Sequence, residues 1–186
     1  MRKAILVGIF IASLSPSLAS ACSCFCKFDH SVSEYMENHK AFWGIPKQSS
    51  LTSEYLVTSE VEVVDGYGRL QVGETITTIS QPDDGASCGI QLNTGTPQFI
   101  VSSTAVDKNI VSSCNCQPPT AYLLEYLVEG KDTYLPNLNK CWKDDEIKSG
   151  KKCKVWRDAP DDNIAEHNER RRIYKNLREQ QTDKSE

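Results

Sequence analysis

The feature that most constrains this chain is a set of eight cysteines that follow a signal-like N-terminus. Residues 19–26 read ASACSCFC, so three of the cysteines occupy alternate positions. The other five are Cys88, Cys114, Cys116, Cys141 and Cys153. An even number of cysteines in an exported chain predicts a disulfide framework, although the count alone leaves the pairing open.

The N-terminal 21 residues have the organisation of a signal peptide. Met1–Lys3 carries positive charge, Ala4–Ala12 is mostly apolar, and Ala19–Ala21 offers small residues at a cleavage site. We expect cleavage after Ala21; a cut after Ala19 is the competing alternative and would leave Ser20 first. Neither this run nor any later one reaches the roughly 20 apolar residues of a membrane helix. The sequence therefore predicts a secreted protein (periplasmic if the source is bacterial) without a membrane span.

Charge and motif content disfavour two functional classes. Loss of Arg2 and Lys3 with the signal takes the net charge from −4 to −6, which argues against nucleic acid as a partner. The three histidines lie in no metal or triad motif, and neither a nucleophile-elbow nor a phosphate-loop motif is present. We therefore expect no enzymatic activity and no cofactor. The histidines are His30, His39 and His167.

The first two thirds of the chain favour β structure. Segments rich in β-branched and aromatic residues alternate with turn signals, of which Asp65–Gly68 is the clearest, and this pattern favours a sandwich or a barrel. A short helix is expected at Ser33–His39 with Ser31 or Ser33 as its N-cap. The expected strands are 41–44, 55–58, 60–64, 74–79 and 98–103.

From about Glu129 the composition becomes polar and charged. A helix start is expected near Asp161, and residues 164–181 are good helix formers with Ile164, Ile173 and Leu177 as a thin apolar stripe. We expect this helix to be solvated or loosely docked, with Arg170–Arg172 on an exposed face.

The order of several short motifs resembles the netrin-like module. A signal leads into Cys-Ser-Cys, followed by Phe42-Trp43-Gly44, a V-x-V strand at 61–63, Cys88-Gly89, an L-x-x-G turn at 92–95, the strand FIVSS and a later cysteine pair. This module is shared by the tissue inhibitors of metalloproteinases, netrins and complement proteins, and the resemblance covers roughly Cys22 to Tyr126. It implies a mainly β, OB-type five-stranded barrel with flanking helices. The expected domains are 1–21 (signal), 22–128 (netrin-like) and 129–186 (extension with a local disulfide loop and a charged helix).

The resemblance also implies a disulfide pairing. It pairs Cys22 with Cys88 and ties Cys24 to Cys114 or Cys116. Cys26 would then take the other member of that pair. The pairing that remains, Cys141–Cys153, closes a local loop.

In the inhibitors of this family the mature N-terminus binds the protease. A terminal Cys22 would have a free α-amine with a pKa of about 7.7–8. Its amine and carbonyl would chelate the zinc of a metalloendopeptidase in trans, in the position that the catalytic water occupies. Ser23 would enter the specificity pocket, so the resemblance implies a protease-binding segment of Cys22, Ser23 and Cys24 and an extracellular protein partner.

Three alternatives remain open. Phe25-Cys26-Lys27 stands where the inhibitors usually have a proline-containing segment, and a second disulfide-rich domain is missing, which favours a non-inhibitory structural or interaction module. Cleavage before a cysteine also resembles bacterial lipid attachment, which would make the chain a lipoprotein anchored at Cys22. In the third alternative, five reduced cysteines would bind copper(I) or zinc, although an oxidising compartment removes thiolates. These are Cys22, Cys24, Cys26, Cys114 and Cys116.

Overall fold

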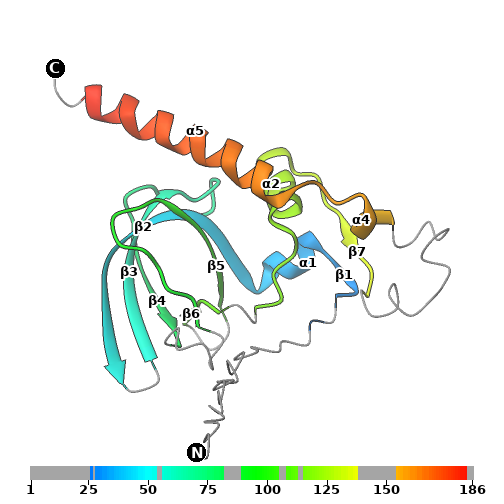
Figure 1. The fold of residues 1–186 in the computed structure, drawn as a ribbon, viewed down its shortest axis with the longest axis horizontal. Helices are drawn as coiled ribbons and strands as arrows, with labels where there is room; N and C mark the ends of the chain where they lie inside the picture. Colours follow the sequence, from blue (N-terminus) through cyan, green and yellow to red (C-terminus); the bar gives the residue numbers. More distant parts are fainter. Residues whose placement is uncertain are drawn as a thin grey trace, which may run out of the picture.

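The fold is built on a closed five-stranded barrel (Figure 1). The computed structural model describes residues 26, 28–53, 56–81, 89–104, 108–112, 115–137 and 154–183. Its strands are β2 (His39–Ser53), β3 (Leu56–Asp65), β4 (Thr75–Ser80), β5 (Gln98–Ser103) and β6 (Asn109–Ile110). The mainly β barrel with a charged C-terminal helix confirms the predicted fold class.

The strand order is that of an OB fold. Around the barrel it runs β2-β3-β4-β6-β5, and β2 closes the barrel by pairing with both β3 and β5. The neighbours are antiparallel except β4 and β6, which are parallel. The predicted turn at Asp65–Gly68 follows β3, where Tyr67 and Gly68 both adopt positive φ.

Every second side chain of a strand points into the barrel and helps to fill its interior. In β4 the residues Ile76, Thr78 and Ser80 are buried and their neighbours are more exposed, as the sequence pattern predicted. Gly44 has no side chain because a Cβ there would collide with Val61 Cγ1 inside the barrel. The apolar residues of the interior are Phe42, Val61, Val63, Ile76, Ile100 and Val111.

A second apolar core lies outside the barrel, beneath helices α1 (Val32–Glu37) and α2 (Thr120–Glu129). Strands β1 (His30–Ser31) and β7 (Tyr134–Leu135) pair beside it. Ser31 is the N-cap of α1 and forms a capping box with Glu34, so one of the two predicted caps is confirmed. The fully buried members of this core are Val32, Leu123 and Leu135.

The C-terminal part contains α4 (Lys154–Arg157) and α5 (Asp162–Asp183), and α5 runs along α2 and β3 (Figure 1). The expectation of a loosely docked helix was wrong, and of the arginine triplet only Arg171 is exposed. Arg172 forms an ion pair with Asp65 of β3 at 2.6 Å, and Arg170 lies over the ring of buried Trp43. Ile173 is buried, whereas Ile164 is exposed and takes no part in the contact.

Tyr67 adds a third contact between α5 and the barrel. Its hydroxyl donates to Glu169 Oε1 at 3.0 Å, and burial together with the Glu169 carboxylate raises the pKa of Tyr67, which keeps this donor protonated.

Among the described helices, none combines the length and apolar character that crossing a membrane requires.

Candidate functional site

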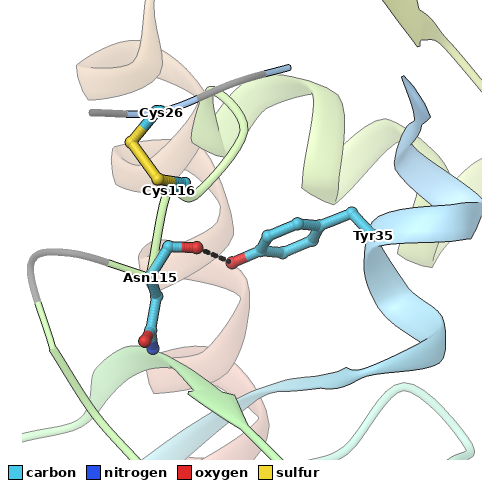
Figure 2. The surroundings of a disulfide bond; sticks show 4 residues. All are labelled: Cys26, Tyr35, Asn115 and Cys116. Atoms are coloured by element: carbon cyan, nitrogen blue, oxygen red, sulfur yellow. Dashed lines mark hydrogen bonds between the residues drawn. A yellow bond between two sulfur atoms is a disulfide. The ribbon is translucent and has the colours of Figure 1, made fainter. Parts of the chain in front are cut away.

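The N-terminal segment is attached to the barrel domain by a disulfide between Cys26 and Cys116 (Figure 2). Cys116 lies in the connection between β6 and α2, and its Cα is 5.1 Å from that of Cys26. The bond joins residues 90 positions apart in the sequence. The disulfide therefore fixes Cys26 next to the loop that follows β6, the last strand of the barrel.

A hydrogen-bonded bridge supports the same attachment. The Tyr35 hydroxyl of α1 donates to the carbonyl oxygen of Asn115 at 3.1 Å (Figure 2). The Asn115 side-chain amide donates to the carbonyls of Val101 and Ile110, at 3.3 and 3.1 Å. Burial raises the pKa of Tyr35, so its hydroxyl remains a donor across the physiological range. The loop that carries Cys116 is thereby tied to β5, β6 and α1.

The chain that follows Cys26 is held along its length. Phe28 is 6% exposed and packs into the outer core, and the backbone amide of Val32 donates to the carbonyl of Thr133 at 3.0 Å. Both the amide and the hydroxyl of Ser33 donate to the Asp132 carboxylate. These contacts hold the chain from Phe28 to Ser33 against the outer core and the segment at 132–133.

His39, at the start of β2, packs against Tyr35 of α1. Its ring stacks on that of Tyr35 with 3.8 Å between centroids, and its Nδ1 donates to the Tyr35 carbonyl at 2.7 Å. Burial lowers the pKa of His39, although the Tyr35 hydrogen bond acts in the opposite direction. His39 is therefore neutral at physiological pH.

The described structure contains two of the predicted site residues. Cys26 pairs with Cys116, which is one of the two partners that the resemblance left open. The predicted protease-binding and zinc-chelating residues lie outside the described part of the chain, as do the remaining cysteines, so their roles stay predictions. These residues are Cys22, Ser23, Cys24, Cys88, Cys114, Cys141 and Cys153.

Sequence reasoning did not identify Tyr35 and Asn115 as supports of the N-terminal segment. A single tyrosine in a short helix and a single asparagine between two cysteines carry no local signal for a contact across 80 residues. Within the described ranges, no group of three histidine, cysteine or acidic side chains could hold a metal ion.

Comparison with protein-family models, with curated proteins and with solved structures found no match to this chain. The netrin-like resemblance thus rests on the sequence motifs given above, and the function that it implies is developed below as a proposal.

Proposed function

We propose that this chain is an exported binding module that acts through its N-terminal segment, and that its target is the active-site zinc of a metalloendopeptidase. The observation that supports this proposal is the Cys26–Cys116 disulfide, which fixes the segment to the barrel domain. The partner would be an extracellular protein, and the chain itself would supply ligands rather than catalysis.

The attachment limits how far the proposed ligand can move. Cys22 precedes Cys26 by four residues, and four residues of chain span at most about 14 Å. A zinc bound by the backbone of Cys22 must therefore lie within about that distance of Cys26. Restricting a short segment in this way lowers the conformational entropy that binding would otherwise remove.

The chemistry of the proposed contact requires a free terminus. An unprotonated α-amine and the carbonyl of the same residue present two ligands to one metal ion in a five-membered ring. A catalytic zinc keeps one coordination position for water, which such a pair can occupy. Any residue that remains in front of Cys22 converts the amine into an amide, which no longer offers a lone pair to the metal.

The experiment compares three forms of the mature chain against a panel of zinc metalloendopeptidases. The first begins at Cys22, the second retains Ser20-Ala21, and the third begins at Cys22 and carries Ser23→Arg. We expect inhibition by the first form, and a loss of at least 100-fold in affinity in the second and third. The matched control is Ser50→Arg, which places the same side chain on an exposed position of β2 and is expected to leave inhibition unchanged.

Two results would contradict the proposal. One is a chain with a verified Cys22 start that inhibits no protease of the panel. The other is equal inhibition by the form that retains Ser20-Ala21, because the amine would then be irrelevant.

A further inference from the structure

We propose that the open end of the barrel next to α1 binds a phosphate or sulfate group. A hollow of about 530 Å³ lies there, lined by residues of α1, of the start of β2 and of the turn after β3, together with Thr104, Lys108 and Asn109. We call it the mouth site; the lining residues used in the argument are Lys40, Arg69, Lys108 and Asn109. This proposal does not depend on the proposed function.

The alternation of the strands directs polar side chains toward this end of the barrel. Lys40 is two residues before Phe42, which lies in the barrel interior, and so shares its face of β2. Asn109 precedes the interior residue Val111 by two positions in the same way. The mouth site is therefore the polar end of the barrel core, a common position for ligands in barrels.

Ser102 is a buried polar neighbour of the mouth site. It pairs with Lys40 across the β2–β5 ladder and shares the interior face of β5 with Ile100. The residue is 0% exposed, and its hydroxyl has no hydrogen-bond partner among the described residues. A buried hydroxyl without a partner is unfavourable. Ser102 does not itself line the hollow, so its backbone amide serves as a reporter of binding at the neighbouring Lys40.

The charge of the mouth site is opposite to that of the whole chain. Among the described residues, Lys40, Arg69 and Lys108 line it together with one acid, Glu37, although the full chain has a net charge of −4. None of the three cations has a carboxylate within ion-pair distance in the described ranges. By contrast, the paired cations of the described surface include Lys47, Lys131, Lys154, Arg170, Arg172 and Lys175. Unpaired cations around one hollow repel each other and raise the local concentration of anions.

Arg69 is oriented without being neutralised. Its Nη2 donates to the Tyr126 hydroxyl at 2.9 Å, and its guanidinium lies 5.1 Å from the centre of the Tyr126 ring. A phenol holds the guanidinium in place while the positive charge stays available. Arginine presents several N–H donors to a tetrahedral oxyanion, and the two lysines add point charges.

The size of the mouth site fits more than an ion. A volume of about 530 Å³ lies within the range of about 300–1,000 Å³ that small-molecule pockets occupy. The recognised chemistry is therefore the doubly or singly charged tetrahedral oxyanion, either free or as an ester on a small carrier.

The experiment titrates the ¹⁵N-labelled mature chain, with its disulfides intact, with inorganic phosphate, inorganic sulfate, glucose 6-phosphate and glucose 6-sulfate at low ionic strength. We expect saturable shifts at the backbone amides of Lys40, Ser102 and Asn109. Tighter binding of a sugar ester than of the corresponding ion would identify the ester as the ligand, and equal binding would identify the free oxyanion.

Two variants with the same change in net charge provide the control. Lys40→Gln/Lys108→Gln is expected to weaken binding at least 10-fold. Arg171→Gln/Arg178→Gln removes two exposed cations of α5 and is expected to weaken it less than 2-fold. Equal losses in the two variants, shifts that map away from the mouth site, or the absence of saturable shifts with all four probes would overturn the proposal.

Discussion

Replacing both Cys26 and Cys116 by serine is expected to destabilise the fold by an amount that reports on a second disulfide. In the chain-entropy model, the stabilisation by a disulfide grows with the logarithm of the loop that it closes. The two cysteines are 90 residues apart, so a lone bond here is worth about 4.6 kcal/mol at 25 °C.

The expected destabilisation is smaller if a neighbouring disulfide closes the same loop. The resemblance leaves Cys114 as the partner of Cys24 once Cys26 is paired with Cys116. With that bond present, the Cys26–Cys116 bond closes a ring of only about six residues and is worth about 2.2 kcal/mol. The double variant therefore distinguishes a single attachment of the N-terminal segment from a double one.

The assay is guanidinium unfolding without reductant, followed by tryptophan fluorescence, since Trp43 is fully buried and reports on the barrel. Wild-type and variant chains are compared by the free energy of unfolding extrapolated to water, because loss of a cross-link also changes the slope. A loss below about 1 kcal/mol would refute the reasoning, since it lies under both values.

Three further predictions follow from the packing and the charges. Gly44→Ala should lower the free energy of unfolding by about 1–3 kcal/mol in a denaturant titration, because the new methyl group meets Val61 inside the barrel; unchanged stability would contradict that contact. Arg172→Gln removes the partly exposed ion pair with Asp65, so we expect a loss of about 0.5–1 kcal/mol and faster proteolysis within α5; an unchanged cleavage rate would show that the pair does not hold the helix. His39 should titrate below its ordinary pKa of 6.5 when its ring is followed by NMR. Because the pKa of His39 is lower in the folded than in the unfolded chain, its contribution to stability is present above pH 6.5 and is lost as the pH falls through the folded pKa. A folded pKa above 6.5 would contradict the effect of burial.

The barrel strands could be predicted because their patterns are local. Residues 98–103 contain the apolar run Phe99-Ile100-Val101 between polar residues, and β5 has these bounds. The alternation at 74–79 likewise corresponds to β4, shifted by one residue. The long β2 was predicted only at 41–44, since its exposed second half, KQSSLTS, has no apolar pattern and is ordered by pairing with β3.

Helix α2 was not predicted although its signals are present. Pro119 precedes the first turn, and Gly130 in the left-handed conformation ends the helix. Its apolar residues are so frequent that no clear polar face stands out, because the helix packs on α1 and on α5.

The contacts that position functional side chains could not be predicted from the sequence. Lys40, Arg69 and Lys108 lie in separate segments, and only closure of the barrel brings them to one hollow. The docking of Arg172 on Asp65 similarly joins residues 107 positions apart. A single sequence records which residues can make such contacts but not which of them meet.

The central claim is tested most directly by the intact mass of the exported mature chain, measured before and after reduction and alkylation. The account predicts a chain that begins at Cys22 with an unmodified amine, and eight cysteines that become alkylated only after reduction. A chain that begins at Ser20, or one whose mass includes acyl groups on Cys22, would contradict the account, because neither offers a free cysteine amine to a metal ion.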